Sequence, residues 1–204
     1  MTPHSTLALA LATMLFALIP GPGVAAMVTQ SLTRGFSTAA LWAVGMALGD
    51  LVYLLTAIFG LGWMAEQFGS GFLALKYAGA AYLIHLGVRH WTSRPLEIAE
   101  NAIQPRTGRL RSLAAGLSIS LSNPKVIAFY CGFLPGFMDL KTLTPTDVLI
   151  AACTVISSIV SVLLCYAWLA SKGRSLLRST RAWKILNRSA GAVMIGAGIA
   201  VASD

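Results

Sequence analysis

The hydrophobic positions of this chain form six long runs that are separated by short polar stretches. The runs cover residues 5–29, 38–62, 71–91, 113–135, 147–170 and 184–202. About 20 mostly apolar residues are enough for a helix to cross the hydrocarbon core of a membrane. Backbone N–H and C=O groups in lipid must be paired within the segment, which favours helices over loops and open strands. The pattern therefore predicts an all-α integral membrane protein with about six transmembrane helices.

The composition supports the same conclusion. Hydrophobic residues make up 56% of the chain and charged residues 11%, whereas soluble domains carry about 25% charged residues. The mean hydropathy is +0.74. The net charge of +8 would by itself suit a nucleic-acid binder, but the charges lie in short stretches between the apolar runs. We therefore expect a lipid bilayer around one transmembrane domain, residues 1–204, and no nucleic-acid partner.

Twelve of the 15 Lys and Arg residues lie in or beside the first, third and fifth connections between runs. They are Arg34, then Arg89, Arg94, Arg106, Arg109 and Arg111, then Lys172, Arg174, Arg178, Arg181, Lys184 and Arg188. The other side of the membrane keeps Lys76 and Lys141. Because cytoplasmic loops carry the excess of basic residues, the odd-numbered connections are predicted to be cytoplasmic and both termini periplasmic.

The longest connection, residues 92–112, contains Pro95 and Pro105 and is predicted to be a cytoplasmic linker. It separates a first half, residues 1–91, from a second half, residues 113–204. Each half has three runs, and an odd number makes the halves cross the membrane in opposite directions. This arithmetic permits, without requiring, two inverted three-helix halves, which are common among transporters.

The first run of each half is interrupted by proline. The interruptions contain Pro20, Gly21, Pro22 and Gly23 in the first run, and Asn123, Pro124 and Lys125 in the fourth. Proline removes a backbone donor and clashes with the carbonyl four residues earlier, which leaves the carbonyls of Phe16, Leu18 and Ser120 without helical partners. One such break is most simply a kink, since proline is tolerated in membrane helices. Two breaks at matching places favour a transporter binding site.

Three of the ionisable residues within the runs are candidate site residues. Asp50 is near the middle of the second run, close to Gly45 and Gly49, which permit close helix packing. A charge at that depth is costly, so Asp50 is a candidate for binding a substrate amine or a proton, or else a buried structural group. Lys125 either binds a substrate carboxylate or forms a structural ion pair with Asp50. His85 is a candidate proton relay, with a packed structural histidine as the alternative.

No catalytic motif is present. The sequence lacks H-E-x-x-H, G-x-S-x-G and a Walker motif, which argues against a hydrolytic enzyme and against ATP-driven transport by this chain alone. No cofactor or metal site is predicted. The remaining classes are a secondary transporter of a small molecule, or a channel-like or structural membrane subunit without coupled transport.

Three motif regions resemble the LysE/RhtB family of bacterial amino-acid exporters. The first comprises residues 19–23 (I-P-G-P-G), 34–36 (R-G-F) and 45–50 (G-M-A-L-G-D). The second is the segment 75–87 (L-K-Y-A-G-A-A-Y-L-I-H-L-G), and the third comprises 122–125 (S-N-P-K) and 133–137 (F-L-P-G-F). Their order and spacing suit the family and cover most of the chain. His85 departs from the pattern, because an apolar residue or tyrosine is expected there.

The resemblance implies efflux of amino acids or their analogues across the bacterial inner membrane, driven by the proton gradient. In such an exporter the two breaks would cradle the substrate backbone, with Lys125 at its carboxylate and Asp50 at its ammonium group or at the exchanged proton. The sequence leaves open which amino acid is moved and whether the chain forms a homo-oligomer.

Overall fold

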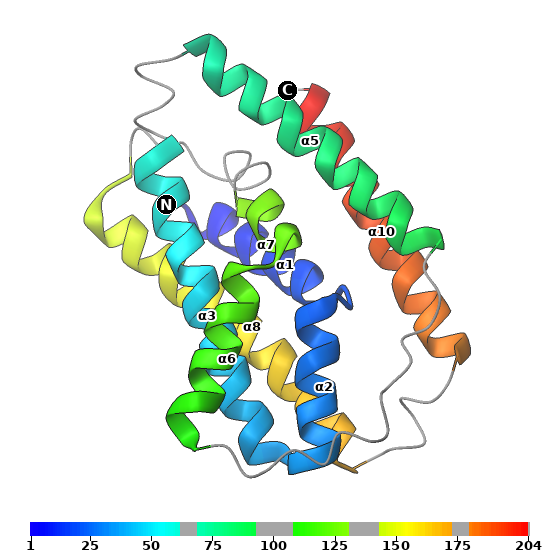
Figure 1. Cartoon of the computed structure of the whole chain (residues 1–204). Helices are drawn as coiled ribbons and strands as arrows, with labels where there is room; N and C mark the ends of the chain where they lie inside the picture. The colour runs from blue at the N-terminus through cyan, green and yellow to red at the C-terminus, as the bar shows by residue number, and fades with distance from the viewer. Residues whose placement is uncertain (62–68, 93–107, 131–142, 173–179, 204) are drawn as a thin grey trace.

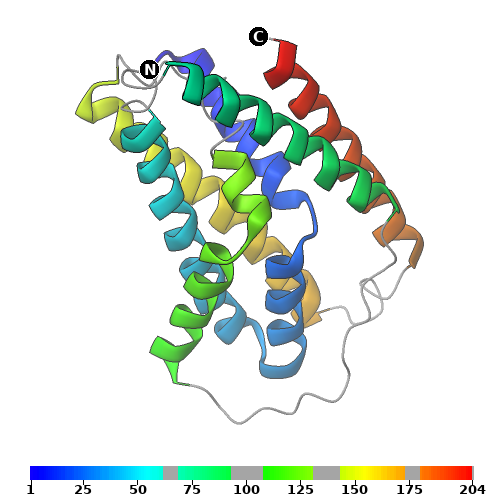
Figure 2. The ribbon, with the colours of Figure 1, turned by 45° about the horizontal axis from the view of Figure 1, so that its top comes forward.

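The structure is a computed structural model, and it describes residues 1–61, 69–92, 108–130, 143–172 and 180–203. Every regular element in these segments is a helix (Figures 1 and 2). In chain order they are α1 (Pro3–Leu18), α2 (Pro22–Arg34), α3 (Phe36–Thr56), the π-helical turn η1 (Ala57–Leu61), α5 (Gly69–Thr92), α6 (Arg109–Leu121), α7 (Pro124–Ala128), α8 (Pro145–Lys172) and α10 (Thr180–Ser203). The motif at residues 133–137 lies outside the described residues.

The first hydrophobic run folds into two helices, as its prolines predict. α1 ends at Leu18 and α2 begins at Pro22, with 65° between the two axes. Pro22 takes the first position of α2, where the missing N–H would have had no helical partner. The extended backbone at Ile19 and Gly21 carries the chain across the break.

The fourth run is also broken where predicted. α6 ends at Leu121 and α7 begins at Pro124, and Asn123 caps α7 by accepting a hydrogen bond of 3.1 Å from the Lys125 backbone N–H. One boundary differs from the prediction, because α6 already begins at Arg109, inside the stretch 92–112 assigned to the linker. Leu110, between two arginines, is 81% exposed, and the first buried residue of the helix is Ser112.

The long helices coincide with the other four runs. Within the described residues, two helices are long and apolar enough to cross a membrane, at Phe36–Gly60 and Pro145–Lys172, and the bent α1–α2 pair makes a third if it is one span. Helices α5 and α10 are 24 residues long and match the third and sixth runs. The helical fold class is thus confirmed, while the count of six spans stays a prediction.

Two helix pairs meet through glycine. A Cβ atom added to Gly45 of α3 would lie 2.1 Å from the Leu113 carbonyl oxygen of α6, and one on Gly116 would lie 2.2 Å from that of Trp42. This confirms the predicted close contact at Gly45. Similarly, α5 and α10 approach each other where Gly87 faces Gly191. A Cβ atom added to Gly87 would lie 2.7 Å from the Gly191 carbonyl oxygen, and one added to Gly191 would lie 2.6 Å from the Gly87 carbonyl oxygen.

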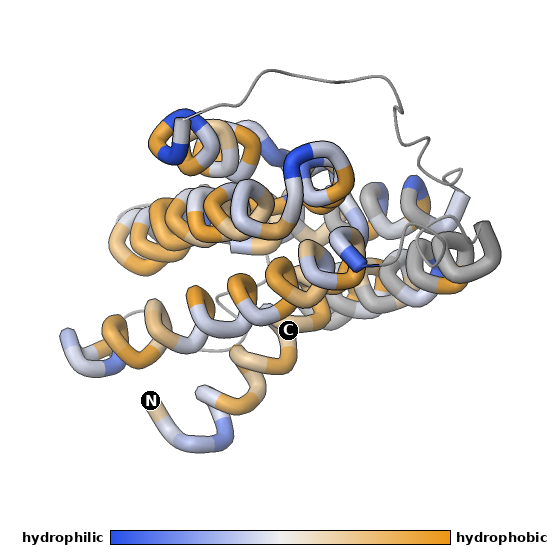
Figure 3. Tube along the Cα trace, turned by 90° about the horizontal axis from the view of Figure 1, so that it is seen from below, coloured by the Kyte–Doolittle hydropathy of each residue, from blue (hydrophilic) through white to orange (hydrophobic). Residues whose placement is uncertain are grey.

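Basic helix ends lie on one side of the molecule. Arg34 ends α2, Arg109 and Arg111 begin α6, and Lys172 ends α8, and these ends all lie in the lower part of Figure 1. The chain termini lie in the upper part. Hydrophobic positions recur along all the helices in Figure 3, and strongly hydrophilic ones are few. This distribution is typical of helices that are immersed in lipid and end in water.

The α3–α6 contact yields a first prediction. Gly45→Ala places a methyl group against backbone that cannot move alone, so the helices must separate, and we expect a loss of about 3 kcal/mol in the free energy of unfolding. Gly196→Ala on α10 is the matched control, since an added Cβ there meets no atom within 4 Å. Thermal unfolding of the purified proteins in detergent measures both. Equal melting temperatures for the two variants would contradict the close packing.

Candidate functional site

Asp50 is buried at the interface of α3 and α6. Its side chain is 4% exposed, and its Oδ1 accepts a hydrogen bond of 2.9 Å from the Ser120 hydroxyl. Ser120 reaches the carboxylate because Gly49 has no side chain, since a Cβ there would lie 2.6 Å from the Ser120 Cβ. No other hydrogen bond to Asp50 is present among the described residues. The predicted stripe of Gly45 and Gly49 thus lets α6 pack against Asp50. The contact at Ser120 lies one turn before the break at Pro124.

Lys125 is buried at the other break. Its side chain is 5% exposed, and its ammonium group donates hydrogen bonds to the carbonyl oxygens of Phe16, at 2.8 Å, and Ile19, at 2.7 Å. The same group lies 4.3 Å from the centre of the Phe16 ring. Carbonyls at a helix C-terminus carry partial negative charge, and an aromatic face attracts a cation. Lys125 of the second half therefore supplies hydrogen-bond donors to the carbonyls at the C-terminal end of α1 in the first half.

Two tyrosines pair with further carbonyls at the breaks. The Tyr166 hydroxyl of α8 donates to the Leu18 carbonyl oxygen at 2.8 Å, and the Tyr53 hydroxyl of α3 donates to that of Leu121 at 2.5 Å. Each break thus receives a hydroxyl from the opposite half of the chain. Sequence reasoning missed both residues. The available signal was a tyrosine inside an apolar run, whose hydroxyl needs a partner when it is buried.

The structure brings the two breaks together. A Cβ atom added to Gly21 would lie 3.5 Å from the Lys125 Cδ, and one on Gly23 would lie 3.7 Å from the Asn123 amide nitrogen. The predicted residues of both breaks therefore face one another, although they are separated by about 100 positions in the sequence. We call Asp50, Ser120, Lys125 and the two breaks the buried polar cluster.

Within this cluster Asp50 and Lys125 form no direct ion pair, because the hydrogen bonds of Lys125 go to backbone carbonyls. The two side chains are nevertheless close enough to act on each other electrostatically. His85 is not part of the cluster as described. Its side chain on α5 is exposed, and its described ring neighbour is Tyr82, with 6.2 Å between the ring centres.

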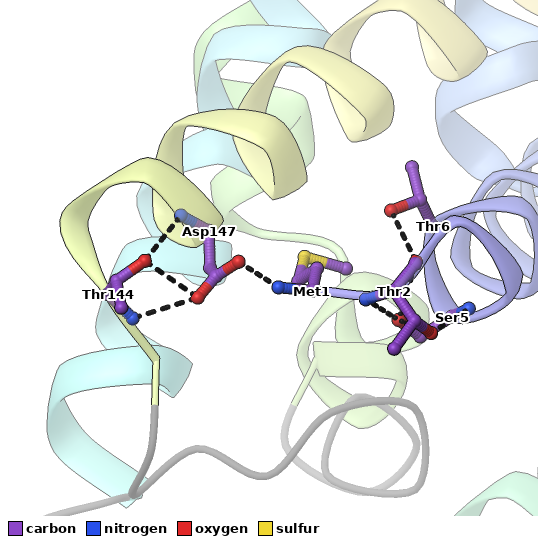
Figure 4. Close-up of polar contacts among 6 residues, drawn as sticks. All are labelled: Met1, Thr2, Ser5, Thr6, Thr144 and Asp147. Atoms are coloured by element: carbon purple, nitrogen blue, oxygen red, sulfur yellow. Dashed lines mark hydrogen bonds and ion pairs between the residues drawn. The ribbon is translucent and has the colours of Figure 1, made fainter.

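A second carboxylate, Asp147, has a different environment at the start of α8 (Figure 4). It forms an ion pair with the Met1 ammonium group, and its Oδ2 accepts hydrogen bonds from the backbone N–H and hydroxyl of Thr144, at 3.0 and 2.7 Å. These contacts cap α8 and attach the chain terminus to it. Asp147 therefore has a structural role that is separate from the buried polar cluster.

Comparison with known proteins identifies the family of the chain. The profile of the family described as "LysE type translocator" matches residues 14–204. This chain belongs to that family. The resemblance drawn from the sequence motifs is thereby confirmed, and the chain is a membrane translocator rather than an enzyme.

Several relatives of this LysE-type translocator cover nearly its whole length. An uncharacterized membrane protein of Synechocystis is 33% identical over 92% of this chain and 90% of its own. The homoserine/homoserine lactone efflux proteins of Salmonella typhi and Salmonella typhimurium are each 30% identical over 93% of this chain and 91% of their own. No solved structure matches the chain.

The capping role of the tyrosines gives the second prediction. Tyr166→Phe removes the hydrogen bond from the Tyr166 hydroxyl to the Leu18 carbonyl oxygen, which should lower the free energy of unfolding by about 1 kcal/mol. The control is Tyr77→Phe on α5, because Tyr77 is 50% exposed. Melting temperatures in detergent compare the variants. If Tyr166→Phe and the wild type have the same melting temperature, the Tyr166 hydroxyl does not stabilise the break between α1 and α2.

Proposed function

We propose that this LysE-type translocator exports amino acids or their analogues across the bacterial inner membrane by proton antiport. The observation that carries the proposal is the buried Asp50 carboxylate beside two facing helix breaks. A carboxylate at membrane depth marks an ion or substrate pathway by default. The efflux proteins of Salmonella that resemble this chain are named for homoserine and homoserine lactone, which makes a small amino acid or its lactone the first substrate to test.

The cluster offers complementary groups for both ends of an amino acid. Asp50 would bind the ammonium group. The N-terminus of α2 begins at Pro22 without a side-chain cap, so its first N–H groups and its partial positive charge suit a carboxylate. Lys125, which touches Gly21 at this end of α2, would add a full positive charge. Pro20, Gly21, Pro22, Gly23, Asn123 and Pro124 would shape the space between these groups.

Substrate binding at Lys125 would be linked to the conformation of the break. An ammonium group has three N–H donors, and two of them hold the Phe16 and Ile19 carbonyls. A substrate carboxylate would compete with these carbonyls for Lys125, and the angle between α1 and α2 would then be free to change. This coupling is what alternating access requires, because the site must open first to one side and then to the other.

Proton exchange would occur at Asp50. A proton from outside would neutralise the carboxylate, release the substrate ammonium group and reset the carrier after it moves to the cytoplasm. The hydrogen bond from Ser120 would keep the carboxylate oriented in both stages. A relay through His85 stays a prediction from the sequence, because the described contacts do not connect it to Asp50.

The proposal includes two inverted three-helix halves, residues 1–91 and 113–204. Three observations support it. Each half has a broken helix followed by two long ones, and each break is capped by a tyrosine from the other half. The separation in sequence between Pro20 and Pro124 also equals the separation between Gly87 and Gly191. These two glycines meet where α5 crosses α10. The basic helix ends on one side support cytoplasmic odd-numbered connections and periplasmic termini.

The third prediction tests this orientation. Single cysteines at Thr2 and Ser203, in a variant without Cys131, Cys153 and Cys165, should react in intact cells with a thiol reagent that does not cross the inner membrane. The reason is that both termini lie opposite the basic helix ends. A cysteine at Arg109 is the control and should react only after the membrane is opened. Labelling of either terminus only from the cytoplasm would reverse the topology.

The fourth prediction tests export and its coupling. Purified protein in vesicles should move at least one substrate from a panel of homoserine, homoserine lactone and the common amino acids when a pH gradient is applied. Asp50→Asn keeps the size and hydrogen bonding of the side chain but cannot titrate. We expect it to lower gradient-driven export at least tenfold while membrane insertion and melting temperature stay close to those of the wild type.

Asp147→Asn is the matched control, because it makes the same change in a carboxylate outside the cluster. It should retain gradient-driven export. Wild-type export by Asp50→Asn would make Asp50 a structural group and remove the coupling assignment. No movement of any compound in the panel by the wild type would favour the alternative, a channel-like or structural membrane subunit without coupled transport.

A further inference from the structure

Tyr130 is a buried tyrosine whose hydroxyl has no hydrogen-bond partner among the residues that the structure describes. Its side chain is 0% exposed, and the residue lies two positions after the end of α7. Buried tyrosine hydroxyls nearly always find a donor or acceptor. An unpaired one at this depth therefore needs an explanation, because a phenylalanine would fill the same volume without a polar atom.

The surroundings of Tyr130 belong to the buried polar cluster. Its ring packs edge-to-face on Phe129, with 5.1 Å between ring centres, and Phe129 stacks on Phe16 at 4.2 Å. The Lys125 ammonium group lies over the other part of this stack, against Phe16. The Asp50 carboxylate is also close enough to act electrostatically on the Tyr130 hydroxyl. Tyr130 thus belongs to the aromatic stack that also contacts the Lys125 ammonium group.

A comparison with the two capping tyrosines shows what is unusual. Tyr53 and Tyr166 donate to carbonyls at the ends of α6 and α1, so their hydroxyls stabilise the breaks. Tyr130 lies among the same helices, but its hydroxyl donates to none of these carbonyls. The hydroxyl therefore adds nothing to the folded protein that the ring does not already provide.

We propose that the Tyr130 hydroxyl binds an oxygen atom of the exported substrate and helps determine specificity. This inference rests on the proposed function. The ligand class is a small ammonium compound whose sp² oxygen is separated from the ammonium nitrogen by two carbon atoms, as in an amino-acid carboxylate or a lactone carbonyl. Two Lys125 protons are held by carbonyls, so Lys125 has one proton left for the substrate. A second acceptor site of the substrate can then take the Tyr130 O–H, which is unpaired among the described residues.

Burial of Tyr130 is compatible with this role. Solvent reaches almost none of the side chains of Asp50, Lys125 and Tyr130. A substrate therefore reaches them only when the helices around the breaks separate. Alternating access includes such an opening on each side of the membrane. A site that is built to hydrogen-bond a substrate also discriminates strongly against compounds without the matching group.

The test is Tyr130→Phe in purified protein, with homoserine, homoserine lactone and the common amino acids as probes. We expect the half-saturation concentration for transport to rise about tenfold, since one hydrogen bond to the substrate is lost. The maximal rate should change much less. The melting temperature without substrate should equal or exceed that of the wild type, because no hydrogen bond within the protein is broken. Tyr77→Phe, a tyrosine on the exposed part of α5, controls for the general effect on transport.

The possible outcomes separate the two proposals. If wild type and Tyr130→Phe have the same half-saturation concentration, Tyr130 does not bind the substrate, although export itself stands. If Tyr130→Phe melts as far below the wild type as Tyr166→Phe does, its hydroxyl has a partner within the protein and the inference is overturned. If the wild type moves no probe, the proposed function fails, and this inference fails with it.

Discussion

The architecture of this protein depends on pairing the backbone carbonyls at its two helix breaks. Lipid offers no hydrogen-bond donor, so each freed carbonyl must find one inside the protein. Lys125 supplies two donors at the end of α1, Tyr166 supplies one beside them, and Tyr53 supplies one at the end of α6. These donors come from distant parts of the sequence, so satisfying the breaks also fixes how the helices are arranged around them.

The glycines make this arrangement sterically feasible. Gly49 lets Ser120 approach Asp50, and Gly21 leaves room for the Lys125 side chain beside the first break. Helix packing in lipid depends on close contact and hydrogen bonding more than on apolar burial. The same close contact of α3 and α6 therefore stabilises the fold and holds the carboxylate at the end of a broken helix. Stability and site geometry share the same residues here.

Much of this could be predicted from the sequence, because the strongest signals are local. The helices follow from the hydrophobic runs, the breaks from proline chemistry, and the α3–α6 contact from Gly45 and Gly49. The sequence could not show that Lys125 binds the Phe16 and Ile19 carbonyls rather than Asp50, because that choice depends on the angle between α1 and α2. It also could not select Tyr53, Tyr166 and Tyr130 from the other tyrosines, since their roles depend on which helix end each hydroxyl reaches.

The crossed tyrosine caps have a consequence for biosynthesis. The Leu18 carbonyl is made early, but its donor at Tyr166 enters the membrane only with α8, after most of the chain has been synthesised. Until then the first broken helix must be shielded by water, by lipid headgroups or by the insertion machinery. A first half released alone would keep this defect, and a second half alone would lack Tyr53 for Leu121. The first break therefore lacks its Tyr166 donor until the fifth hydrophobic run has been made.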